Sequence, residues 1–136
     1  GLEVAFCVSP LADRLLKHHR GFGGVAYLYL KQANQEAAAK QLLLRLDGIE
    51  EVLTREEAAQ RFRLMASRIG DLVVIPDKDT VFGDLPAERE KLAADYRSHG
   101  SLYETEIPLL AHNGHELFDD WDSVENNLHL TQNLFR

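Results

Sequence analysis

The sequence predicts an α+β fold, a two-layer sandwich in which helices lie on one face of a mixed, mostly antiparallel sheet. Two observations lead to this prediction. Short stretches at residues 25–30, 49–53 and 72–75, apolar apart from Glu50 and Glu51, have the length of strands, and the first two are followed by segments with helical spacing and helix caps. The last stretch runs into an acidic turn, residues 77–79, which favours an antiparallel return strand.

The elements begin with an apolar run, residues 2–8, which ends at Ser9-Pro10 and is consistent with a buried strand. Residues 11–19 predict a short helical segment, which glycines at 21, 23 and 24 interrupt. Residues 25–30 are apolar on both faces of an extended chain, as expected for a strand covered on both sides.

The first long helix is expected to start at Asn34, whose side chain suits an N-cap. Apolar residues then recur at a spacing of four, with two more beside them: Ala38, Leu42 and Leu46, next to Ala39 and Leu43. This spacing predicts one apolar stripe against the sheet, with Leu42 and Leu46 buried. Gly48 is expected to end the helix, because glycine adopts the left-handed conformation without a clash.

The second strand and helix carry a clearer signal. Residues 49–53 read as a strand, and Thr54 with Glu57 forms a capping box that starts a helix running from Arg55 to about Phe62. Residues 72–75 are uniformly apolar and predict a buried strand, and residues 80–82 are expected to return beside it as a β-hairpin. Further on, residues 85–96 are compatible with a helix, and residues 116–136 are helical in part.

Composition limits the classes of function. The chain of 136 residues suits one domain or slightly more, and its net charge of -7 disfavours a nucleic-acid surface. The single cysteine, Cys7, cannot form an internal disulfide, which fits a reducing cytoplasm. No apolar run is long enough to span a bilayer, so no membrane partner is expected.

His99 is the leading candidate for chemistry. It lies in RSHG, before an apolar segment ETEIPLL (residues 104–110) that reads as a strand, so its loop would project from a strand end. An imidazole held in such a loop can serve as a zinc ligand, although a lone histidine is more often an ordinary surface or core residue. Asp95 stands four residues earlier, and the two side chains would meet only if a helix continued through Gly100.

The other candidate residues can be explained by an ordinary structural role or by chance as well as by a function. His18 and His19 could contact a substrate, but adjacent side chains on a helix point about 100° apart, which favours a structural role. His112 and His115 have the spacing of one helical face, although Asn113 and Gly114 indicate a loop. Asp77 with Asp79, and Glu104 with Glu106, fit a turn and a solvated edge.

Four segments together carry a family resemblance: GGVAYLYLK (23–31), GIEEVLTREEAAQRF (48–62), GDLVVIPDKDTVFGD (70–84) and RSHGSLYETEIPLLAHN (97–113). They resemble, in the same order, the cap and the last characteristic block of the alkaline phosphatase superfamily, in the branch that holds the phosphonoacetate hydrolases and the nucleotide pyrophosphatase/phosphodiesterases. The resemblance covers most of residues 18–113. It implies the end of a core segment and a linker at residues 1–22, a cap domain at 23–84 and the C-terminal part of the metal-binding core at 85–136.

The resemblance implies a hydrolase with two zinc ions and a threonine nucleophile, which cleaves the carbon–phosphorus bond of phosphonoacetate to acetate and phosphate. His99 matches a zinc ligand of that family, while the nucleophile and the other ligands would precede the cap. The chain is therefore expected to be a C-terminal fragment, inactive and unable to hold zinc by itself. The partner would be a small phosphonate, and a homodimer is one expectation. The rival interpretations are another phosphodiesterase of the superfamily and a non-catalytic α+β binding module.

Overall fold

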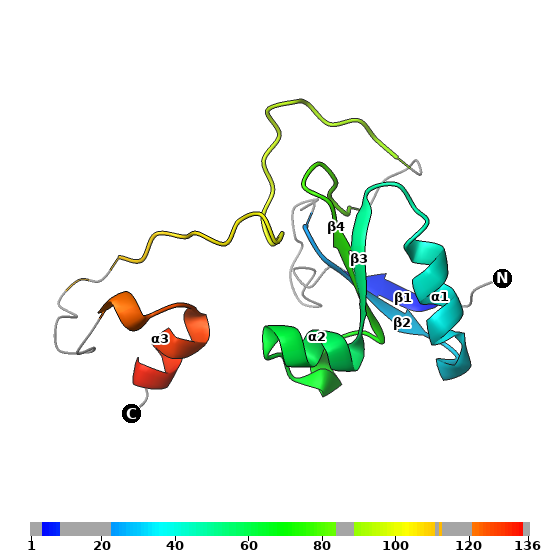
Figure 1. Cartoon of the computed structure of the whole chain (residues 1–136). Coiled ribbons are helices and arrows are strands. Elements are labelled where there is room, and N and C mark those ends of the chain that lie inside the picture. The colour runs from blue at the N-terminus through cyan, green and yellow to red at the C-terminus, as the bar shows by residue number, and fades with distance from the viewer. Residues whose placement is uncertain (1–3, 9–22, 84–88, 111, 113–120, 135–136) are drawn as a thin grey trace. The chain divides into compact units, whose positions relative to one another are not determined.

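A computed structural model describes residues 4–8, 23–83, 89–110, 112 and 121–134 of the chain (Figure 1). The chain divides into two compact units, Gly1–Thr105 and Glu106–Arg136. The first unit holds the sheet and two α-helices, and the second holds a 3-10 helix, Trp121–Ser123, and the helix α3, Asn127–Leu134. Across the described residues, no helix has both the length and the apolar character that a membrane crossing requires.

The first unit is built on a four-stranded sheet with the order β1-β2-β4-β3. Its strands are β1 (Val4–Val8), β2 (Ala26–Leu30), β3 (Ile49–Thr54) and β4 (Leu72–Pro76), and every neighbouring pair is antiparallel. Since β2 and β3 both run opposite to β4, they are parallel to each other, with β4 between them. The sheet is therefore a split β-α-β unit in which the last strand fills the gap. The predicted α+β class is confirmed.

The two helices of the first unit pack on opposite faces of the sheet, which differs from the single helical layer that the sequence predicts. Side chains alternate across a strand, so neighbouring residues of β4 point to opposite faces. On one face Leu72 and Val74 form a cluster with Ala39 of α1 (Glu36–Leu43). On the other face Val73 and Ile75 form a cluster with Ala58 of α2 (Arg55–Phe62). The buried strand β4 thus supplies both cores, which explains why its sequence is uniformly apolar.

The buried side of α1 is rotated from the predicted one. Ala39 is 0% exposed and Leu43 is partly buried, whereas Leu42 is 50% and Leu46 is 44% exposed. The prediction that Leu42 and Leu46 are core residues is therefore wrong. Ala39 and Leu43 lie beside Leu42 on the helix, and the small Ala39 allows the closer approach to the sheet. Leu46 also lies beyond the helix, which ends at Leu43.

The ends of α1 also differ from the prediction, whereas those of α2 agree with it. Asn34 belongs to a 3-10 helix, Ala33–Gln35, and is not the N-cap of α1. Gly48 has the expected positive φ of 87°, but it lies in the turn before β3 and not at the helix end. At α2, both hydrogen bonds of the Thr54–Glu57 capping box are present, and the helix covers the predicted residues.

The predicted hairpin after β4 does not form. Phe82 pairs with Gly23, through N–H to carbonyl bonds of 2.9 Å in both directions, and not with β4. The reason is that β2 and β3 already occupy both edges of β4. A returning strand therefore has no free backbone groups of β4 to bond with.

Two further predictions fail in the second half of the chain. Residues 89–98 contain no helix, and residues 104–110 contain no strand. A strand needs a neighbouring edge, and the described residues provide no partner strand for ETEIPLL, whose Ile107 and Leu110 are 67% and 93% exposed. The short helix predicted at 11–19 lies outside the described residues.

Candidate functional site

The backbone of His99 is bound to a glycine pair at the entrance of β2. Gly24 N–H donates to the carbonyl of His99 at 3.0 Å, and Gly23 forms a parallel bridge with His99. On its other side Gly23 is bonded to Phe82. The glycine pair therefore lies between the segment that follows β4 and the loop that carries His99, and it joins them through main-chain bonds.

Both glycines that face each other across this contact are required by geometry. A Cβ atom built on Gly24 would lie 2.6 Å from the backbone N of Ser101 and 2.8 Å from the carbonyl C of Gly100. Carbon atoms do not approach backbone this closely, so only glycine fits at position 24. Gly100 has a φ of 83°, a conformation that side chains with a Cβ rarely adopt. Gly100 turns the chain directly after His99, and Gly24 leaves room for this turn beside the residues that lead into β2.

The imidazole of His99 is exposed and lines a concave region of about 890 Å³. The region is bordered by Gly24 and by three segments of the first unit, namely residues 46–49, residues 77–82 and the chain from 89 to 104. Its lining carries both signs of charge, with cations such as Lys78 and Arg97 and acids such as Asp77 and Asp79. This mixture does not by itself select an anionic or a cationic ligand.

The loop after His99 is also attached to the sheet through a side chain. The hydroxyl of Tyr103 donates to the carboxylate of Glu50 on β3, and this hydrogen bond raises the pKa of Tyr103 above its ordinary value. Nothing in the spacing of the sequence indicates this contact, because the two residues are 53 positions apart. This hydrogen bond and the one from Gly24 N–H together attach the segment from His99 to Tyr103 at both of its ends.

The other predicted candidates are not gathered around His99. Asp95 lies in a turn, so no helix brings its carboxylate beside the imidazole. His112 is exposed and belongs to the second unit. His18, His19 and His115 lie outside the described residues. Within the part of the chain that is described, no three His, Cys, Asp or Glu side chains form a group that could hold a metal ion.

The two acidic pairs, Asp77 with Asp79 and Glu104 with Glu106, are explained by local chain structure. The Asp77 carboxylate accepts from the backbone N–H of Asp79 at 3.0 Å, which is the local turn that Asp favours. Glu104 and Glu106 are exposed and lie in a segment without strand structure, so no shared strand face exists for them. The contact that the sequence analysis missed is the one between Gly24 and His99. Its signal was the Gly23-Gly24 pair, which indicates a close approach of two backbones.

Comparison with known proteins gives a specific relationship. No protein-family model matches the chain. A crystal structure of phosphonoacetate hydrolase from Sinorhizobium meliloti 1021 in complex with phosphonoacetate matches with a TM-score of 0.59 and 32% identity, over 72% of this chain and 24% of the hydrolase chain. The complex of that hydrolase with phosphonoformate matches with a TM-score of 0.59 and 31% identity, over 71% and 24%. The chain thus spans about a quarter of the length of the solved hydrolase, and it is related in sequence and in fold to that part of a phosphonoacetate hydrolase.

Proposed function

We propose that this chain is the cap and the histidine loop of a zinc-dependent hydrolase of the alkaline phosphatase superfamily, and that the intact enzyme cleaves phosphonoacetate to acetate and phosphate. The observation that carries the proposal is the 32% identity to a phosphonoacetate hydrolase over 72% of the chain, at a TM-score of 0.59. The order of the segments also agrees with the family pattern, because the cap strands precede the SHG loop.

His99 would supply one zinc ligand. Its imidazole is exposed on a loop whose backbone is hydrogen-bonded on the cap side, so the side chain is accessible while its attachment point is held. These properties suit a ligand, which must be fixed in position and open to the ion. One imidazole is not a complete site, and the proposal places the nucleophile and the remaining ligands in residues that this chain does not include.

The chemistry divides between the metal and the chain. Zinc, when bound, polarises the oxygens of the phosphonate and lowers the pKa of the nucleophile. The residues of this chain orient His99, border the region beside it and limit access of water to that region. The cap would also recognise the part of the substrate that is not transferred.

The test is a pair of histidine substitutions in the full-length protein. His99→Ala should remove one ligand, so bound zinc should decrease and hydrolysis of phosphonoacetate should fall by orders of magnitude, while far-UV circular dichroism stays unchanged because the side chain is exposed. His112→Ala is the matched control, since it removes an exposed imidazole from the other unit, and both properties should remain near those of the unmodified protein.

Two results would contradict the assignment. Normal zinc content and rate in His99→Ala would show that this histidine is not a ligand. Damage by His112→Ala alone would place the site elsewhere. If the full-length protein hydrolyses nitrophenyl phosphodiesters but not phosphonoacetate, the metal site is still supported, and the proposed substrate is wrong and is a phosphodiester instead.

A further inference from the structure

We propose that Gly24 is a positioning residue, which sets the location of the His99 imidazole by letting the chain just before β2 lie directly against the SHG loop. The inference rests on the proposed function, because it concerns the histidine that would hold zinc. It adds a second role for the cap: besides covering the substrate, the cap would hold a metal ligand in place.

The first support is the path of the main-chain hydrogen bonds. Gly24 N–H binds the carbonyl of His99 itself and not that of a neighbour, so the bond acts on the residue whose side chain would bind the metal. Gly24 is two residues before β2, which is paired with β1 and with β4. One hydrogen bond thereby connects the His99 backbone to the residues that lead directly into a strand inside the sheet.

The second support is steric. The atoms that a Cβ on Gly24 would meet, at 2.6 Å and 2.8 Å, belong to the main chain of Ser101 and Gly100 and not to the end of a flexible side chain. An added methyl group therefore has to displace the loop itself. Metal–ligand distances are tolerant only to about 0.2 Å, so a displacement that relieves this clash would move the imidazole out of bonding position.

Gly70 provides a matched control. A Cβ there would lie 2.7 Å from the carbonyl O and 2.9 Å from the N of Leu28, again main-chain atoms, but of β2 and not of the histidine loop. Gly70→Ala should consequently disturb the sheet about as strongly as Gly24→Ala disturbs the loop. The pair separates an effect on the position of His99 from a general loss of packing.

The experiment uses the full-length protein with Gly24→Ala, Gly70→Ala and His99→Ala. Zinc affinity is measured by competition with a chelator, and the unfolding midpoint of the zinc-free protein is measured separately. Gly24→Ala should weaken zinc binding by about 10–100-fold, the range seen when groups that orient a ligand are lost. Gly70→Ala should lower the unfolding midpoint and leave the zinc affinity of the folded protein unchanged.

Unchanged zinc affinity in folded Gly24→Ala would overturn the inference, and so would an equal loss of affinity in Gly70→Ala. Normal zinc binding by His99→Ala would instead refute the proposed function, because His99 would not be a ligand. Gly24 would then have no role in positioning a metal ligand.

Amide hydrogen exchange keeps the inference testable even where Gly24→Ala does not fold. In the unmodified protein, removal of zinc should increase exchange at the Gly24 amide, because coordination holds the His99 carbonyl that accepts from it. Residues 26–30 serve as the internal reference and should exchange at the same rate with and without zinc. An identical rate at Gly24 in both states would show that the bond and the metal are not coupled.

Discussion

At the scale of single residues, two alanines determine how each helix approaches the sheet. Ala39 and Ala58 are the buried residues of α1 and α2, each with 0% exposure, and each lies in a different core cluster. A methyl side chain lets a helix lie close to the strands, so Leu43 packs beside Ala39 and Leu42 lies on the exposed flank of α1. Leu46 is exposed as well, beyond the end of the helix.

The clearest residue-scale prediction compares two leucines. Leu72 is 0% exposed in β4, so Leu72→Ala should lower the free energy of unfolding by about 2–5 kcal/mol, the usual loss for a core leucine. Leu46 is 44% exposed, and Leu46→Ala should change it by no more than about 0.5 kcal/mol. Urea denaturation of both variants measures the difference, and equal losses would mean that the packing around α1 differs from that described.

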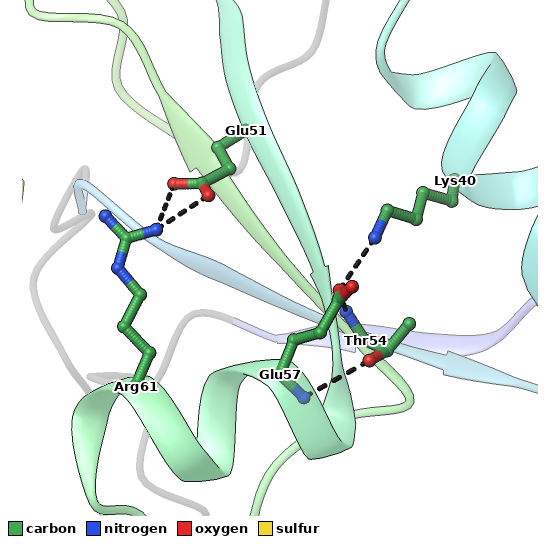
Figure 2. A network of polar contacts seen from close by, with 5 residues as sticks. All are labelled: Lys40, Glu51, Thr54, Glu57 and Arg61. Carbon is green, nitrogen blue, oxygen red and sulfur yellow. Dashed lines mark hydrogen bonds and ion pairs between the residues drawn. The ribbon is translucent and has the colours of Figure 1, made fainter.

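At the scale of elements, one carboxylate connects the two helices around the edge of the sheet. Glu57 of α2 accepts from the backbone N–H of Thr54 and from Nζ of Lys40 on α1, both at 2.7 Å. Figure 2 shows these bonds beside the ion pair between Arg61 and Glu51, which attaches α2 to β3 at 2.5 Å. Because α1 and α2 pack on opposite faces, the Lys40–Glu57 pair spans the edge strand β3 at its end.

This network predicts a pH dependence of stability. The hydrogen bond from Lys40, with that from the Thr54 backbone, lowers the pKa of Glu57 below its ordinary value of 4.5. A carboxyl group with a lowered pKa in the folded state stabilises the protein above its unfolded pKa, and this contribution disappears as the pH falls through the folded pKa. Glu57→Gln keeps an acceptor for Thr54 but loses the charge, so its unfolding midpoint should lie below that of the unmodified chain at pH 7 and approach it below pH 4.5.

Glu56→Gln is the control for this measurement. Glu56 is an exposed acid in the same first turn of α2, and it shares the favourable interaction with the helix dipole. The difference in midpoint between the two variants at pH 7 isolates the contact with Lys40. Since the pair is exposed, the difference should be small and should decrease in high salt. A difference that persists at acid pH would contradict the interpretation.

At the scale of the whole molecule, the described residues gather no group of three potential metal ligands around His99. We therefore expect the purified 136-residue chain to be inactive on phosphonoacetate and on nitrophenyl phosphodiesters, with or without added zinc. The assay follows phosphate and nitrophenol release, with the full-length protein as the positive control. Turnover by the chain that a chelator abolishes would refute the view that its catalytic residues lie elsewhere.

Several elements were predictable because their signals are local. The capping box needs only Thr54 and Glu57, three residues apart, and it located the start of α2 correctly. The uniformly apolar run of β4 indicated a buried strand, although it did not show that each face of the strand receives its own helix. Propensity and periodicity are properties of neighbouring residues, so the α+β class and the positions of β2, β3 and β4 follow from them, whereas the strands predicted at 80–82 and 104–110 do not form.

The tertiary structure decided what depends on residues distant in the chain. Periodicity predicted one apolar stripe with Leu42 and Leu46 buried, and only packing against the sheet showed that Ala39 is the buried residue of α1. The hairpin after β4 was excluded because β2 and β3 fill both of its edges, which no local pattern records. In the same way the sequence by itself pointed to His99 through its motif and its resemblance, whereas the bond from Gly24 joins residues 75 positions apart. Backbone pairing over such a separation depends on which edges remain free once the sheet has formed, and that is a property of the folded chain.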